Sequence, residues 1–190
     1  VMTIAVGCSP ERSTGLDSLE LQHKQSKQAL TPVLGDVDLL LGGTEDTPYT
    51  INYADLLAAA DVTVDTGLTP IFIVSDIGNG VLTKDGLAVE PGITILGSGD
   101  SFVFSPALDA SGVIVAFSVS LSDGTLTSDD VADVSIEFAA VNDAPVAADS
   151  DVSATAGTSV AFLFSATDVD DMESDLIYTI TVEPSYGSYV

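Results

Sequence analysis

The chain has 190 residues, with 29 Asp and Glu against 4 Lys and Arg, a formal net charge of −25, and 46% hydrophobic residues. This apolar content excludes an acidic disordered chain, because disordered sequences are poor in apolar residues, and it predicts a hydrophobic core beneath an acidic surface. The negative charge argues against nucleic acids and anionic membrane surfaces as partners. No apolar run reaches the length of a membrane-spanning helix, so no membrane insertion is expected.

The N-terminal stretch differs in charge from the rest of the chain. Arg12, Lys24 and Lys27 lie in it, whereas Lys84 is the only basic residue after Pro32. We therefore expect a leader over residues 1–31, in which residues 16–30 form a short helix or stay loose. Cys8 is the only cysteine, which excludes an internal disulfide. The apolar run that should precede a lipidated cysteine is absent, which favours an ordinary unpaired thiol.

The first half of the remaining sequence predicts one helical turn and two strands. Residues 53–61, YADLLAAAD, have a helical composition. The run IFIV at 71–74 suits a strand that is covered on both faces. Phe102 and Phe104 alternate with smaller residues in a strand that Pro106 ends.

Two longer alternating runs follow, and they carry the strongest strand signal. The first, at 113–121, places Val113, Val115, Phe117, Val119 and Leu121 on one face. The second repeats the pattern with Val134, Ile136 and Phe138. Short Gly- and Asp-containing turns separate the strands, which favours an all-β, antiparallel β-sandwich.

The strand pattern then begins again. Residues 155–164 are similar to residues 44–53, and residues 175–190 to residues 69–83, at an offset of about 107 to 111 residues. That offset fits a tandem array of whole domains. We expect a complete repeat at 32–144 and the N-terminal part of a second, truncated repeat at 145–190, so that the chain is a fragment.

Four motifs in this order resemble the bacterial cadherin-like tandem repeats of large, type I-secreted surface adhesins. They are TEDTPYTI at 44–51, the stretch from SFVFSP to SDGTLTS at 101–128, VNDAPVA at 141–147 and DVDD at 168–171. The resemblance implies an Ig/cadherin-like sandwich on the bacterial cell surface, outside the cell. It further implies calcium at the domain junctions and a role in cell adhesion or biofilm formation.

In such modules the ligands of an interdomain calcium ion come from a domain end, the linker and the next domain's acidic loop. By that resemblance the first candidates are Asn142, Asp143, Asp168 and Asp170, joined by Asp171. Calcium takes six to eight hard oxygen ligands in irregular geometry, which these carboxylates suit. Further candidates, provided that the fold brings them to the same end, are Glu45, Asp46 and Asp123.

Simpler interpretations of the same residues stay open. Asp123 fits a hairpin turn, residues 142–145 fit a stiff linker, and residues 168–174 fit a solvated acidic loop. The first repeat also departs from the family, because its Asp61 and Asp65 are widely spaced. The second has Ala156 and Gly157 where the first has Glu45 and Asp46.

We expect no enzyme activity. His23, the only histidine, lies in the leader, and no set of His and Cys ligands suits zinc. The alternatives to an adhesin repeat are a non-catalytic spacer or carbohydrate-binding module of a secreted enzyme, and a structural protein of a phage or surface layer. The expected partners are neighbouring repeats of the same chain and a cell-surface protein or glycan.

Overall fold

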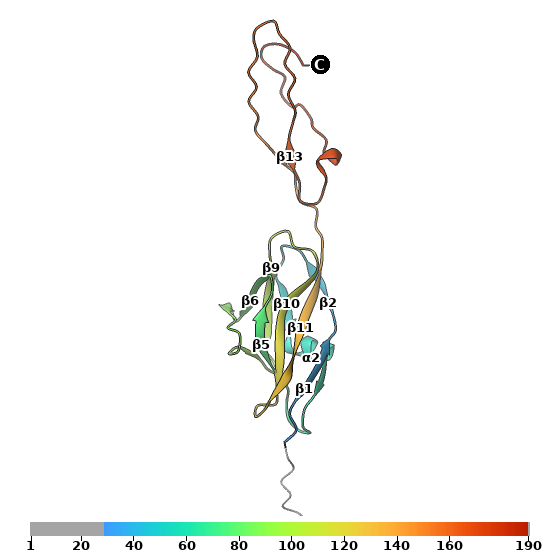
Figure 1. Cartoon of the computed structure of the whole chain (residues 1–190), viewed down its shortest axis with the longest axis vertical. Helices are drawn as coiled ribbons and strands as arrows, with labels where there is room; N and C mark the ends of the chain where they lie inside the picture. The colour runs from blue at the N-terminus through green and yellow to red at the C-terminus, as the bar shows by residue number, and fades with distance from the viewer. Residues whose placement is uncertain (1–28, 190) are drawn as a thin grey trace, which may run out of the picture.

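The computed structural model describes residues 29–189, so the expected leader helix, Cys8 and His23 lie outside the described residues. Residues 33–139 form a β domain, and short elements follow it (Figure 1). The strands of the β domain are β1 Val33–Val37, β2 Leu40–Thr44, β3 Tyr49–Asn52, β4 Ala60–Thr63, β5 Ile71–Ile77, β6 Gly80–Lys84, β7 Leu87–Ala88, β8 Ile95–Leu96, β9 Ser101–Pro106, β10 Gly112–Ser122 and β11 Thr127–Ala139. Helix α2 (Tyr53–Ala59) lies between β3 and β4, and residues 146–175 add β12 Val146–Ala147, β13 Ala166–Thr167 and the 3-10 turn η1 Glu173–Asp175.

Two sheets make up most of the β domain. The larger has the strand order β2-β11-β10-β5-β8, and the smaller has the order β3-β9-β6-β7. Strand β1 pairs with β4 beside them. The prediction of an all-β chain is confirmed. The pairing is antiparallel throughout, except that β2 runs parallel to β11.

The inner faces of the two sheets form one hydrophobic core. Phe102 from the smaller sheet and Phe117 from the larger are fully buried, and their rings meet edge to face with centroids 5.8 Å apart. Phe104 contacts Phe138 across the sheets with tilted rings, at a centroid distance of 6.1 Å. The edge-to-face geometry suits aromatic quadrupoles and adds to the stabilisation from burial.

Strand β10 contains a bulge that the sequence pattern did not reveal. Phe117, Val119 and Leu121 are buried as predicted, but Val113 and Val115 are 63% and 44% exposed. The pairing register with β11 shifts between Val115 and Phe117. One extra residue in a strand turns the following side chains to the opposite face. The prediction that Val113 and Val115 face the core is therefore wrong.

Gly78 accommodates this bulge. Its N–H donates to the carbonyl oxygen of Ala116 at 2.9 Å. A Cβ atom at Gly78 would lie only 2.0 Å from the carbonyl oxygen of Val115. Glycine allows the two backbones to approach this closely, so any larger residue at position 78 must displace the bulge.

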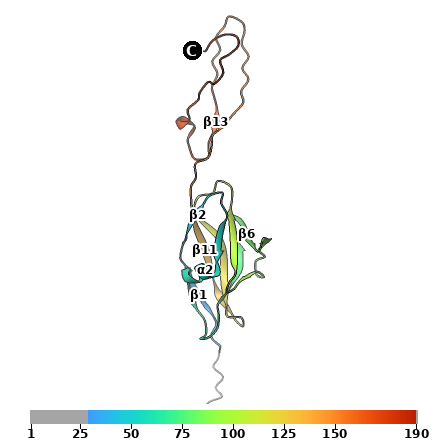
Figure 2. The same cartoon turned by 180° about the vertical axis from the view of Figure 1, so that it is seen from behind.

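The other predicted strands are present, and helix α2 has seven residues instead of the single turn expected. Phe102 and Phe104 in β9 are buried, and so are Val134, Ile136 and Phe138 in β11. These residues confirm the alternation predicted for the two strands. In β5, Phe72 and Val74 are fully buried but Ile71 and Ile73 are only half-buried, so the strand is covered fully on one face and partly on the other. Helix α2 covers one side of the domain, as Figure 2 shows, and buries Tyr53 and Leu56.

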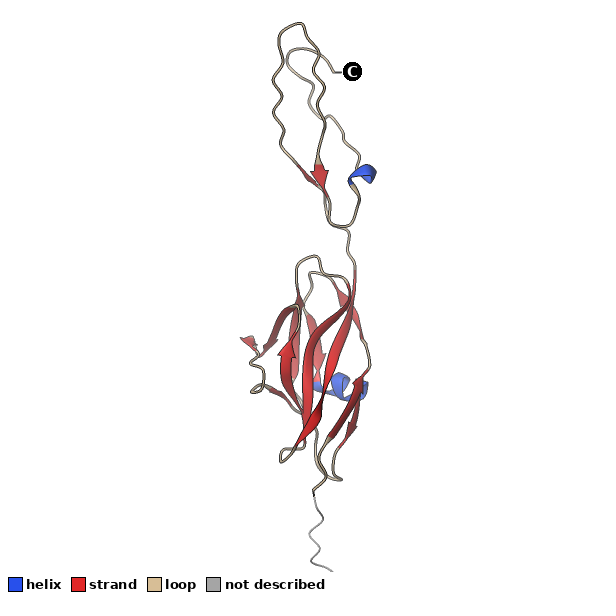
Figure 3. Ribbon diagram, in the orientation of Figure 1, coloured by secondary structure: helices blue, strands red, loops and turns tan. Residues whose placement is uncertain are grey.

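Residues 145–189 contain little regular structure, and Figure 3 shows them mostly as loop. Val146 and Ala147 pair with Thr167 and Ala166, and Ala166 is the only buried side chain in this part of the described chain. Backbone amides without hydrogen bonds exchange quickly. We therefore expect residues 145–189 to exchange faster than residues 100–140 in a hydrogen-exchange measurement. Equal protection of the two segments would refute this expectation.

Candidate metal centre

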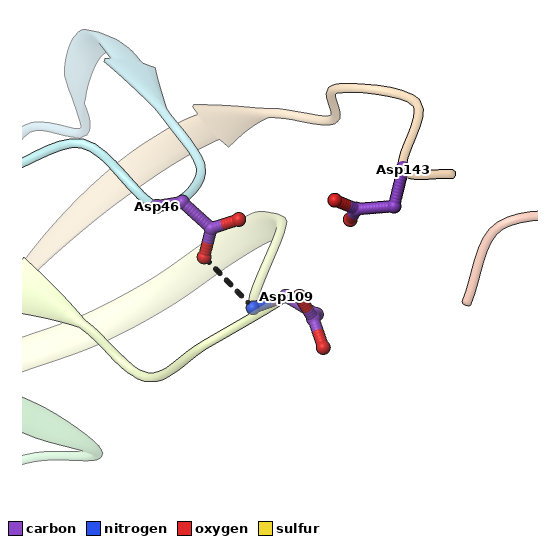
Figure 4. A group of neighbouring side chains, drawn as sticks. All are labelled: Asp46, Asp109 and Asp143. Carbon is purple, nitrogen blue, oxygen red and sulfur yellow. Dashed lines mark hydrogen bonds between the residues drawn. The ribbon is translucent and has the colours of Figure 1, made fainter. Parts of the chain in front are cut away.

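Three carboxylates meet at the end of the β domain where β11 leaves it. Asp46, Asp109 and Asp143 each place one carboxylate oxygen within 4.8 Å of the other two (Figure 4). Asp46 follows β2, Asp109 lies between β9 and β10, and Asp143 lies in the segment after β11. The group thus combines three stretches that are far apart in sequence.

Strand directions bring these stretches together. Strand β2 runs parallel to β11, with Thr44 opposite Ala139, so both strands end at the same place. Strand β10 is antiparallel to β11, so its beginning lies at this end as well. Asp46 and Asp109 both have a φ of +57°, a left-handed conformation that Asp adopts more readily than most residues. The N–H of Asp109 donates to Oδ1 of Asp46 at 3.0 Å.

Glu45 connects the start of this loop to the exit of β11. Its side chain is only 3% exposed. The backbone N–H of Val141 donates to Oε1 of Glu45, and the N–H of Glu45 donates to the carbonyl oxygen of Ala139 at 3.0 Å. Hydrogen bonds to a buried carboxylate are among the stronger ones in proteins, so Glu45 holds the segment that positions Asp143.

The acidic loop of residues 168–171 reaches the same place from the other side. The N–H of Asp143 donates to Oδ2 of Asp170 at 2.7 Å. Within the loop, Oδ1 of Asp168 accepts the N–H groups of Asp170 at 2.9 Å and of Asp171 at 3.0 Å. Asp168 therefore shapes the loop, and Asp170 contacts the linker.

The charge at this junction is not balanced by basic residues. Burial raises the pKa of Asp143, and the carboxylates of Asp109, Asp170, Asp46 and Glu45 raise it further. Burial and the nearby acids also raise the pKa of Asp109. Lys84, the only Lys or Arg within residues 29–189, is paired with Asp100 instead. A bound cation would remove the repulsion between these carboxylates.

Asp143 also has an oxygen without a hydrogen-bond partner. Its Oδ2 is buried and accepts no hydrogen bond among the described residues. A buried carboxylate oxygen without a partner is costly, and such atoms require an explanation such as a water or an ion. Together with the all-oxygen donor set, this atom fits a hard cation such as calcium.

The structure brings most of the sequence candidates to this junction. Glu45, Asp46, Asp143 and Asp170 surround it, as described above. Asn142 is exposed there, and its side-chain Nδ2 donates to the carbonyl oxygen of Asp143 at 2.8 Å. Asp168 and Asp171 lie in the neighbouring loop.

Asp123 lies elsewhere. It follows β10 in the turn to β11, at the end of the hairpin opposite Gly112 and Phe138. Its Oδ1 accepts the N–H groups of Thr125 at 2.7 Å and of Leu126 at 2.8 Å. These bonds hold the pKa of Asp123 below its ordinary value. The condition for including Asp123 in the junction set, that the fold brings it to the same end, is not met.

Asp109 is the member of the group that the sequence analysis missed. It stands alone in the short loop between two predicted strands, with no acidic neighbour. The feature that places Asp109 at the junction is the order of the strands. The loop from β9 to β10 crosses from one sheet to the other next to the exit of β11 and brings Asp109 to the junction, but only the strand order shows this.

A fall in pH offers a direct check of the charge repulsion. Because the pKa values of Asp109 and Asp143 are raised in the folded chain, the folded state binds protons before the unfolded state does, above the ordinary value of 3.8. Stability then rises as pH falls toward this window. We expect urea unfolding of the chain in EDTA to show higher stability at about pH 5 than at pH 7. This gain in stability should be smaller in the Asp109→Asn/Asp143→Asn variant. An equal gain in the variant would show that other acidic residues cause it.

Comparison of the chain with models of protein families, with curated proteins and with solved structures gives no match. Within residues 29–189, no helix is long and apolar enough to span a membrane.

Proposed function

We propose that this chain is a calcium-binding structural repeat of a large bacterial cell-surface adhesin. In this proposal the β domain is an Ig/cadherin-like sandwich, and residues 145–189 belong to the next repeat. The observation that carries the proposal is the meeting of Asp46, Asp109 and Asp143 at the point where the two parts join. Asp170 from the following part is bonded to the backbone of Asp143.

The residues that would hold calcium are the carboxylates of Asp46, Asp109 and Asp143, with Asp170 and Glu45 beside them. All offer hard oxygen atoms, and Oδ2 of Asp143 is buried without a partner. When bound, calcium supplies the positive charge that the junction lacks. The repeat itself needs no reaction, and we propose no catalytic role for it.

Cation binding has a mechanical consequence at this junction. Residues 140–145 connect the two parts. In the described chain, the bond between Asp143 and Asp170 is the one hydrogen bond that joins residues 33–143 to residues 150–189. Pro145 restricts its own φ and keeps Ala144 extended. Without a cation, the facing carboxylates repel and favour bending at the linker. A cation held by both sides resists that bending, which suits a rod that extends from a cell surface.

The extracellular and adhesive parts of the proposal are supported by the resemblance of the motifs to bacterial adhesin repeats. The acidic surface is consistent with calcium-rich surroundings, in which extracellular modules bind calcium with dissociation constants of roughly 10⁻⁴ to 10⁻³ M. Neighbouring repeats are the proposed partners, together with a surface protein or glycan.

Distance measurements between paired spin labels test the stiffening. Labels at Leu87 and Leu163, which are 73% and 88% exposed, report on the two parts once Cys8 is replaced by Ser. We expect a broad distance distribution in EDTA and a narrow one in calcium. Asp143→Asn should keep the distribution broad, whereas Asp129→Asn on the exposed side of β11 should not. A distribution that stays equally broad in calcium would contradict the proposal.

A further inference from the structure

Residues 160–180 expose a set of large apolar side chains, here named the distal apolar face. Its members are Val160, Phe162, Phe164, Tyr178 and Ile180, which are between 39% and 49% exposed. The ring centroids of Phe162 and Phe164 lie 5.0 Å apart, and Phe164 stacks on Tyr178 at 5.3 Å. Two segments therefore contribute to one contiguous surface, and apolar patches of this kind mark interaction sites.

The backbone of the same segments is unpaired. Within the described chain, residues 159–164 and 177–183 take part in no backbone–backbone hydrogen bond. Free N–H and C=O groups beside an apolar face are a template for an added β-strand. A β-strand of a partner would form hydrogen bonds with the unpaired backbone and also cover the exposed apolar side chains.

The β domain contains a matching pair of segments, and there the backbones of both are paired with neighbouring strands. Residues 155–164 are similar to residues 44–53, which places Phe162 at the position of Ile51 and Phe164 at that of Tyr53. Ile51 and Tyr53 are 0% and 7% exposed, against 49% for Phe162 and for Phe164. Ile51 lies opposite Phe102 of β9 in the smaller sheet.

The second segment has a similar counterpart. Residues 175–190 are similar to residues 69–83, with Ile180 at the position of Ile73. In the β domain this stretch is β5, which pairs with β10, where Ile73 lies opposite Ser120. Strands β9 and β10 thus pair with the counterparts of both exposed segments, and Ile73 itself is half-buried on the outer side of β5.

Charge indicates which kind of strand fits. Strands β9 and β10 contain no charged residue, and neither do residues 159–167. Acidic residues stand toward the ends of the distal segments instead, at Asp151, Asp168, Asp175 and Glu183. A second copy of this chain is disfavoured, because its own β9 and β10 are occupied in its β domain and its net charge of −25 repels another copy.

We propose that the distal apolar face binds two β-strands of the β9–β10 type, joined by a short loop, which contain no charged residue and carry large apolar side chains at alternate positions. One strand pairs with residues 159–164, the other pairs with residues 177–183, and the aromatic side chains of the two strands cover Phe162, Phe164 and Tyr178.

A peptide with the sequence of residues 101–122, carrying a short solubilising tag, tests this on the full chain. When the peptide is present, we expect the amides of residues 159–164 and 177–183 to exchange at about one tenth of their former rate or below. A control peptide with the same tag and with Phe102→Ser, Phe104→Ser and Phe117→Ser should give no protection. In the chain, Phe162→Asp should abolish the protection, and Leu87→Asp on the exposed β7 should leave it intact.

Three results would overturn the inference. The first is unchanged exchange in both segments at saturating peptide. The second is equal protection by the control peptide, which would show binding without regard to sequence. The third is protection that appears without peptide as sedimentation shows a dimer, since the occupant would then be a second copy.

Discussion

In about 5 mM calcium, the chain should unfold at a temperature about 4–16 °C higher than in EDTA, and magnesium should give a much smaller shift. A ligand that binds only the folded state stabilises it by RT ln(1 + [L]/Kd), which is about 1–2 kcal/mol for the dissociation constants of roughly 10⁻⁴ to 10⁻³ M found in extracellular modules. For a domain of about 100 residues, each kcal/mol shifts the Tm by about 4–8 °C. Magnesium requires near-ideal octahedral geometry and dehydrates reluctantly.

The Asp109→Asn/Asp143→Asn variant separates a metal site from a general effect of ionic strength. In EDTA this variant should melt above the parent chain, because it removes two repelling charges whose pKa values the junction raises. In calcium it should gain little further stability. Asp129→Asn removes a charge from an exposed site on β11 and should keep the full calcium response. Equal responses of all three proteins would show that the carboxylates at the junction do not bind the ion.

How much of this junction the sequence predicts depends on how its acidic residues are spaced. Asn142 with Asp143, and Asp168 with Asp170 and Asp171, are close neighbours along the chain, so they stand out as groups. Asp109 is isolated in sequence and joins the group only because β10 begins beside the end of β11. Residues that join the carboxylate group only through the strand order can be identified only once the fold is known.

Asp123 is the opposite case, because the sequence makes it a candidate and the fold places it away from the junction. An Asp followed by Gly124 fits both a ligand and a turn residue. Strand β10 carries it to the far end of the hairpin, where its Oδ1 accepts two backbone N–H groups of the turn. The turn interpretation, which was left open, accounts for these contacts.

The fold was predicted where the side chains alternate regularly and missed where one residue is inserted. Alternation identified the inward faces of β9 and β11 because both strands keep a period of two there. In β10 the extra residue is Ala116, which is small and buried next to the buried Phe117. Nothing in a run of Val, Ile and Ala distinguishes a bulge from a regular strand, since all of these residues suit either face.

The bulge leads to the substitution with the largest expected effect. Phe117→Ala should lower the free energy of unfolding of the β domain by about 3–5 kcal/mol, because it removes a fully buried ring and leaves a cavity beside Phe102. Val113→Ala, four positions earlier in the same strand, should lower it by about 0.5–1 kcal/mol, since its side chain is 63% exposed.

Urea unfolding of the two variants and the parent chain in EDTA measures both effects without a contribution from calcium. An unbulged strand would place Val113 and Phe117 on one inner face, and truncating a buried valine would then cost well over 1 kcal/mol. The ratio of the two losses therefore tests the register shift between Val115 and Phe117, rather than only the presence of a strand. A loss well over about 1 kcal/mol at position 113 would contradict the bulge and restore the regular alternation.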